Sequence, residues 1–153
     1  MKRLLYIVGL GHNSSTLLDF LLGASSGVFS TSQLNDLLAP YIPETASEKD
    51  IFWKNVLSQL KDYGKCLGEE NRSIQLEKRI FEFLFSEKQR QYYASVNGEL
   101  LEALSDEIDE QMIVDSSKNV SRALGLSELN QKKVYMLHLV RDIRSYVNSY
   151  NMR

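Results

Sequence analysis

The sequence predicts an α/β protein built around a central parallel sheet. Continuous apolar runs alternate along the chain with segments whose apolar residues recur at helical spacing, which is the order of elements in a parallel sheet. The first apolar run leads through a glycine turn directly into a helical pattern. Eight Gly and two Pro in 153 residues are about half the usual share, which favours long helices and disfavours a mainly β sandwich. At this length we expect a single domain over residues 1–153.

The start of the chain predicts a strand, a turn and a helix in close succession. Residues 4–8 are an apolar run that Gly9 ends, as expected of a central strand buried on both faces. Residues 15–22 follow as a helix that stops at Gly23. Residues 28–29 then mark a short second strand, so that two strands flank the first helix.

The middle of the chain, residues 44–110, predicts a helical insertion. Apolar residues recur there at helical spacing in three segments. The predicted helices cover residues 47–63, residues 73–86, and a stretch that follows Gly98 and reaches Ile108. Tyr92 and Tyr93 lie between the second and third helices and are expected to pack in the core or beneath a lid.

Two further buried strands are predicted after this insertion. Residues 112–115 and 134–140 are continuous apolar runs, and a helix is expected near residues 120–124 between them. His138 lies inside the second run. We therefore expect it to be a core histidine with satisfied polar atoms rather than a catalytic group.

The charge balance limits the possible ligands. Eighteen Lys and Arg residues against 20 Asp and Glu residues give a net charge of −2, which excludes a protein that holds nucleic acid by bulk charge. The acidic residues are concentrated in residues 44–110, whereas residues 111–153 are basic. This distribution suits an anionic ligand bound where the two ends of the chain meet, and a solvated acidic helical face explains it equally well.

Cysteine usage and the N-terminus point to the cytoplasm. Cys66 is the only cysteine, so the sequence offers no intrachain disulfide and no cysteine-based zinc site. Met1, Lys2 and Arg3 precede a short apolar run without a convincing cleavage site, so we interpret that run as the first strand and not as a signal peptide. No apolar run approaches the roughly 20 residues of a membrane span.

A glycine-containing loop predicts an anion site between the first strand and the first helix. Residues 9–16 read Gly-Leu-Gly-His-Asn-Ser-Ser-Thr. Amides at a helix start and nearby hydroxyls donate hydrogen bonds to a phosphate, although a helix start without a ligand is an equally good interpretation. Ser14 and Ser15 stand where the nucleoside-triphosphate P-loop needs Gly and Lys, which makes kinase or ATPase chemistry unlikely here.

A second basic motif follows the last predicted strand. Arg141 leaves the sheet edge, and Ser149 follows just over two helical turns later. The guanidinium and the hydroxyl can hold one anion if the helix start bends suitably. The alternative is a structural pairing of Arg141 with Asp142 or another acid.

Together these segments resemble the sulfotransferases that use 3′-phosphoadenosine 5′-phosphosulfate (PAPS), especially the bacterial and carbohydrate-type members. Their G-x-G-R-S-G-S-T-L-L loop holds the 5′-phosphosulfate, and their L-V-R-D-P-R motif, with a serine eight residues after its arginine, holds the 3′-phosphate. A D-S-S-K sequence follows a strand in such enzymes. This chain matches the loop at Gly9, Gly11, Ser15, Thr16, Leu17 and Leu18, the arginine motif at Arg141 and Ser149, and the D-S-S-K sequence at residues 115–118.

The resemblance implies a P-loop-like three-layer α/β fold and transfer of a sulfuryl group from PAPS to a hydroxyl or amine. The acceptor is a small molecule, a carbohydrate or a lipid, and neither a metal nor nucleic acid is implied. Residues expected to contact PAPS are Gly11, His12, Asn13, Ser14, Ser15, Thr16, Leu17, Arg141 and Ser149. The expected catalytic residues are His12, which replaces the family's Arg or Lys, and Lys118, which lies on the sulfate and acceptor side.

Plainer roles exist for these residues, and the general base is missing. His12 can be a neutral turn histidine, and Lys118 a solvated lysine. Gln33 occupies the position of the family's basic glutamate, and an amide cannot accept a proton as a general base. For Asp115 we expect a role in capping the helix before Val120. A module that binds PAPS or its bisphosphate product without turnover is therefore the alternative function.

The resemblance covers the N-terminal part of the family fold. The family's domains continue beyond the arginine motif with a segment that closes over the adenine, whereas this sequence stops at Arg153. We expect either a fragment of a longer protein or a short member that obtains its cover from a partner chain. In the case of a short member, the partner chain can be a second copy of this chain, which gives a homo-oligomer.

Overall fold

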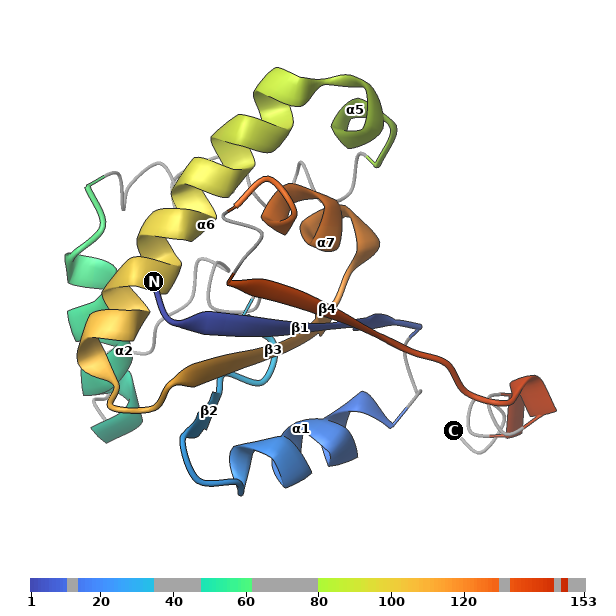
Figure 1. The fold of residues 1–153 in the computed structure, drawn as a ribbon, viewed down its shortest axis with the longest axis horizontal. Helices are drawn as coiled ribbons and strands as arrows, with labels where there is room; N and C mark the ends of the chain where they lie inside the picture. The colour runs from blue at the N-terminus through green and yellow to red at the C-terminus, as the bar shows by residue number, and fades with distance from the viewer. Residues whose placement is uncertain (11–13, 35–47, 62–79, 130–132, 145–146, 149–153) are drawn as a thin grey trace.

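The computed structural model describes residues 1–10, 14–34, 48–61, 80–129, 133–144 and 147–148 of the chain (Figure 1). Strands and helices alternate in the first and last parts of the chain, whereas the described part of the middle of the chain is helical. In chain order the elements are β1 (Arg3–Gly9), α1 (Ser15–Gly23), β2 (Val28–Ser30), α2 (Glu48–Ser58), α5 (Ile80–Phe85), α6 (Glu87–Glu107), β3 (Met112–Lys118), α7 (Val120–Leu126) and β4 (Val134–Leu139).

The four strands form one parallel sheet in the order β2-β3-β1-β4. This confirms the predicted α/β class with a central parallel sheet. β1 lies between β3 and β4, and Leu4, Tyr6 and Ile7 in it are buried, as its uninterrupted apolar run predicts. The short strand at residues 28–29 and the helix near residues 120–124 are also confirmed, as β2 and α7.

Helices lie on both sides of this sheet. Figure 1 shows α1 on one side and α6 and α7 on the other. The main core fills the space between the sheet and the α2 and α6 helices, which contact each other. Its buried residues are Leu4, Tyr6, Leu34, Trp53, Val56, Leu57, Leu60, Leu100, Leu101, Ala103, Leu104, Ile108, Ile113 and Leu126. Among the described residues, no helix is long and apolar enough to cross a membrane.

The helices of the middle segment have different ends from those predicted. The long α6 begins at Glu87, where the Ser86 side chain caps it by accepting a hydrogen bond from the Gln89 amide. It then runs through Gly98, where the sequence predicts a boundary. One interior glycine costs a helix only about 1 kcal/mol, and the buried face of α6 offsets that cost. α2 ends at Ser58, earlier than predicted.

The prediction that the last strand is buried was wrong. β4 is an edge strand that pairs with β1, and its residues 135–138 are exposed. His138 is therefore exposed and is not a core histidine. An apolar run shows that a strand belongs to a sheet, but it does not show whether another strand or helix covers it.

α1 packs against the sheet through small and polar residues. Ser15 and Asp19 are its buried residues, and Asp19 accepts a hydrogen bond of 2.7 Å from the Ser30 hydroxyl on β2. One turn after Asp19, a β-carbon built on Gly23 lies 2.8 Å from Cβ of Ser30. α1 therefore approaches β2 so closely that only glycine fits at its last position.

We predict that Gly23→Ala destabilises the protein by about 1–3 kcal/mol, because the new methyl group forces α1 away from β2. The midpoint of urea unfolding measures this effect. Gly98→Ala is the matched control, since its β-carbon meets only the flexible end of Leu129, at 3.2 Å, inside a helix that prefers alanine. A Gly23→Ala protein as stable as the wild type would contradict the close packing of α1.

Candidate functional site

The carboxyl ends of the four parallel strands lie at one edge of the sheet, and predicted site residues follow them. Val8 near the end of β1 pairs with Lys118, and Gly9 pairs with Leu139 at the end of β4. Arg141 comes two residues after Leu139. In α/β sheets, ligands bind outside this edge, so the topology places Lys118 and Arg141 at the edge where α1 begins.

The start of α1 carries the described part of the predicted phosphate loop. Ser14 precedes the helix with a left-handed backbone, and its side chain makes no capping hydrogen bond. Ser15 is buried, whereas the side chains of Thr16 and Leu17 are exposed. Leu17 can therefore contribute only its backbone amide to a ligand at this edge. The predicted residues Gly11, His12 and Asn13 lie outside the described residues.

Left-handed backbone conformations recur along this edge. Ser14 before α1, Ser32 after β2 and Lys118 at the end of β3 have φ angles of 69°, 58° and 69°. Non-glycine residues with positive φ are uncommon, and such strain is concentrated at binding and catalytic sites. Three neighbouring chain segments are thus held in unfavourable conformations at the same edge.

The D-S-S-K sequence lies inside β3, where the sequence had suggested a position after a strand. Tyr6 of β1 pairs with Asp115, but Val8 pairs with Lys118, so β3 contains one extra residue at Ser116–Ser117. Such a bulge bends a strand and changes the direction of the side chain that follows. Lys118 is that side chain, and it is half-buried.

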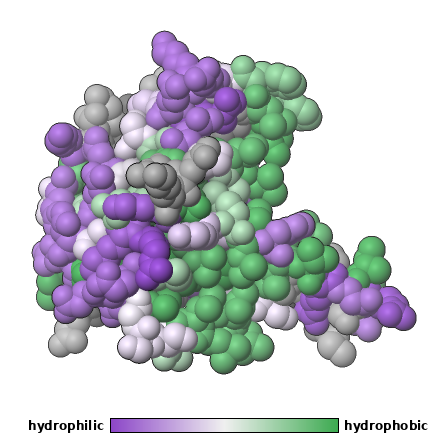
Figure 2. Space-filling view, in the orientation of Figure 1, coloured by the Kyte–Doolittle hydropathy of each residue, from purple (hydrophilic) through white to green (hydrophobic). Residues whose placement is uncertain are grey.

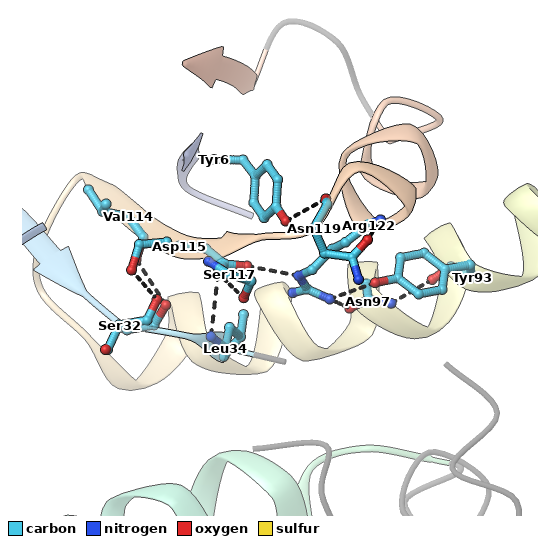
Figure 3. A network of polar contacts seen from close by, with 12 residues as sticks. Tyr6, Ser32, Leu34, Tyr93, Asn97, Val114, Asp115, Ser117, Asn119 and Arg122 are labelled. Carbon is cyan, nitrogen blue, oxygen red and sulfur yellow. Dashed lines mark hydrogen bonds and ion pairs between the residues drawn. The ribbon is translucent and has the colours of Figure 1, made fainter. Parts of the chain in front are cut away.

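Asp115 stabilises this bulge through hydrogen bonds of its side chain (Figure 3). Its Oδ1 atom accepts hydrogen bonds from the Ser117 amide at 2.9 Å and the Ser117 hydroxyl at 2.5 Å. The Leu34 amide, beyond β2, donates to the same atom at 3.4 Å. The Ser32 carbonyl in turn accepts from the Ser116 amide at 2.7 Å. Asp115 therefore joins the bulge to the segment after β2.

A buried ion pair completes this network. The Nε atom of Arg122 on α7 lies 2.9 Å from Oδ2 of Asp115, and both side chains have no exposed surface. Nη1 of Arg122 donates to the hydroxyl of Tyr93 at 2.8 Å and to Oδ1 of Asn97 at 2.6 Å, both on α6 (Figure 3). The pair thus ties β3 to α6 and α7.

The predicted capping role of Asp115 was wrong, because Asn119 caps α7. The Asn119 side chain accepts hydrogen bonds from the Ser121 and Arg122 amides at 2.8 and 3.2 Å. Its carbonyl accepts another from the buried Tyr6 hydroxyl at 2.8 Å. Asn119 thereby fixes the start of α7 immediately after Lys118.

The predicted cations differ in their surroundings. Within the described residues Lys118 forms no ion pair; burial raises the pKa of Asp19, and the charge of Lys118 is close enough to oppose that rise. Arg141 is half-buried at the beginning of the last described segment. Asp142 pairs with Arg144 at 3.3 Å, both groups being exposed. Ser149 lies outside the described residues, so its predicted meeting with Arg141 is not tested.

Sequence reasoning did not find Arg122, Tyr93 and Asn97 as one group. Tyr93 and Asn97 are spaced by one helical turn on α6, so a shared face is visible in the sequence. Arg122 follows Asp115 by seven residues across a strand, a bulge and a helix start, and no sequence spacing signals that contact. Only the packing of α6 against α7 brings the three together.

No metal site is found at this edge or elsewhere in the described ranges, where no three His, Cys, Asp or Glu side chains come together. Comparisons with protein-family models, with curated proteins and with solved structures find no match for this chain.

We predict that Arg122→Met destabilises the fold by about 3–5 kcal/mol, because it leaves the Asp115 charge buried without its cation. Urea unfolding at pH 7 measures the loss. Arg90→Met is the control: Arg90 pairs with Glu128 at 2.7 Å where both side chains are partly exposed, so its loss costs about 1 kcal/mol or less. Equal losses in the two variants would contradict the role of the buried pair.

A second prediction concerns Asp19. Burial under α1 raises its pKa above the ordinary value of 3.8; the Ser30 hydrogen bond opposes this shift, the charge of Asp115 adds to it, and the charge of Lys118 opposes it. The folded state therefore binds the proton more tightly than the unfolded state. This contribution to stability is complete below pH 3.8 and is lost as the pH rises through the raised pKa.

Asp19→Asn removes this titration. Its stability relative to the wild type should therefore increase from about pH 4 upward and then level off. Urea unfolding of both proteins across this pH range measures the difference in their free energies of unfolding. The contributions of the other carboxyl groups are the same in both proteins and cancel in this difference. A difference that is constant with pH, or that changes in the wild type's favour, would contradict the raised pKa.

Proposed function

We propose that this chain is a sulfotransferase domain that binds PAPS at the carboxyl edge of the sheet and transfers its sulfuryl group to a hydroxyl or amine. The observation that carries the proposal is the convergence of α1, Lys118 and Arg141 at one edge, although they are far apart in the sequence. These are the parts that the resemblance assigns to the 5′-phosphosulfate, the sulfate and the 3′-phosphate. The proposed arrangement is the P-loop-like three-layer fold, with residues 44–110 inserted.

The chemistry requires cations and donors at this edge. An acceptor oxygen or nitrogen attacks the sulfur in line, the bond from sulfur to the phosphate oxygen breaks, and negative charge develops on that oxygen. The proton of the acceptor passes to water, because no general base is assigned in this chain. The first amides of α1 point out of the helix start and are suited to donate to the 5′-phosphate. Lys118, fixed by the bulge in β3, is the cation we assign to the sulfate, with His12 beside the leaving phosphate.

A binding module without turnover is the second candidate, and Gln33 favours it. Gln33 follows the left-handed Ser32 at the position of the family's glutamate, and its amide cannot take the proton of the acceptor. A module of this kind would hold PAPS or its bisphosphate product through the same donors. Both candidates need the 3′-phosphate, so a binding measurement tests what they share.

For the acceptor we propose a small molecule, a carbohydrate or a lipid, and the cytoplasm is the proposed location. The helical middle of the chain would line the acceptor side. No metal is assigned to the reaction.

We predict that 3′-phosphoadenosine 5′-phosphate binds the chain and that adenosine 5′-phosphate, without the 3′-phosphate, binds much more weakly. Isothermal titration calorimetry of both nucleotides measures this. Arg141→Ala should weaken binding of the bisphosphate by about 10- to 100-fold, because a charge-assisted contact is lost. It should leave the affinity for adenosine 5′-phosphate unchanged.

Arg144→Ala is the matched control for this experiment, because Arg144 lies in the same segment but pairs with Asp142 at the surface. It should bind the bisphosphate as the wild type does. Equal affinity of the wild type for the two nucleotides, or no binding of either by the folded chain, would overturn the proposal. With binding established, formation of a sulfated acceptor from PAPS distinguishes the enzyme from the module without turnover.

A further inference from the structure

The α1 helix turns its polar face toward the sheet and its apolar face outward, the reverse of an ordinary surface helix. Its face toward the sheet carries Ser15, Asp19 and Gly23, which lie one helical turn apart. Its outer face carries Leu17, Phe20 and Leu21, whose side chains are 62%, 71% and 62% exposed. A surface helix of a single domain normally turns its apolar stripe inward. The exposed stripe of α1 therefore fits a partner and not the chain's own sheet.

Within the described part of the chain, the sheet beside α1 has no covering helix. α1 packs mainly on β2 and β3. Tyr6 points toward α7 and pairs with Met136, so Tyr135 and Leu137 on either side of Met136 point to the opposite face, where α1 lies (Figure 1). Their side chains are 47% and 37% exposed. In a parallel sheet both faces are normally covered, whereas no helix among the described residues covers this face of β4.

Both surfaces belong to the side of the sheet where α1 lies, and neither carries a charged group. Figure 2 shows hydrophobic surface over α1 that continues toward the sheet. Neither the outer face of α1 nor β4 contains a Lys, Arg, Asp or Glu side chain. A charged partner would have nothing to pair with here, whereas an identical surface meets no repulsion.

We propose that this face, formed by Leu17, Phe20, Leu21, Tyr135 and Leu137, is the interface of a two-fold symmetric dimer of this chain. The α1 helix of each copy lies over β4 of the other, and the two α1 helices form one layer between two sheets. A second copy is the occupant that complements both surfaces that the described residues leave open: its apolar helix covers the strand, and its apolar strand covers the helix stripe. Such mutual contact closes the assembly at two copies.

The size of the surface suits a stable dimer. From their exposed fractions, the five side chains present on the order of 450 Å² of mostly apolar surface, which is within the range of functional patches. Homodimer interfaces are about 65% apolar, so this corresponds to about 700 Å² on each copy. Stable interfaces bury about 800 Å² on each partner. This inference does not depend on the proposed sulfotransferase function.

Sedimentation equilibrium of the chain with two charge variants and one control tests the proposal. The wild type should sediment at about twice the 17.6 kDa chain mass at micromolar concentration. Phe20→Glu and Tyr135→Lys, each in an apolar contact, should weaken the dimer by at least about 10-fold. Phe81→Glu is the matched control, because Phe81 on α5 is 73% exposed and lies away from this face. It should leave the dimer unchanged.

An equimolar mixture of the Phe20→Glu and Tyr135→Lys chains tests the arrangement itself. In the proposed dimer, Glu at 20 of one copy meets Lys at 135 of the other, so the mixture should form a mixed dimer at least about 10-fold tighter than either variant alone. Circular dichroism checks that each variant is folded. A monomeric wild type at about 100 μM, an equal effect of Phe81→Glu, or a mixture that stays monomeric would overturn the proposal.

Discussion

The buried ion pair of Asp115 and Arg122 is the contact on which the carboxyl edge of the sheet depends. Removing two charges from water costs several kcal/mol for each ion, which mutual attraction offsets only if the other polar atoms are also bonded. Here Ser117 and Leu34 donate to the carboxylate, and Tyr93 and Asn97 accept from the guanidinium. These partners come from β3, from the segment after β2 and from α6. One internal network therefore sets where three parts of the chain meet.

The same network determines the charge that the edge presents to a ligand. Asp115 is paired internally with Arg122, and burial raises the pKa of Asp19. The Asp115 charge is thus paired within the fold, and Lys118 and Arg141 lie at this edge beside the start of α1. The proposed anion site thus depends on local groups at this edge and not on the net charge of −2.

The sequence predicted the strands and the order of the helices. It did not predict which strands are covered by neighbouring strands and helices. The apolar runs predicted all four strands, because burial within a sheet requires them. They could not distinguish central β1 from edge β4, and so His138 was wrongly expected in the core. The D-S-S-K motif indicated a site, but the bulge at Ser116–Ser117 arises from pairing with β1 and from the bonds of Asp115, neither of which a local pattern contains. Lys118 stays a prediction made from its chemistry, whereas Arg122 was missed because its role depends on packing.

α1 links the proposed site to the proposed dimer. Its first residues belong to the loop we assign to the 5′-phosphosulfate, its inner face is held to β2 at Asp19 and Gly23, and its outer face is the apolar stripe. A second copy packed on the outer face would hold α1 from both sides. The orientation of its first amides, on which phosphate binding relies, would then depend on assembly as well as on the fold of one chain.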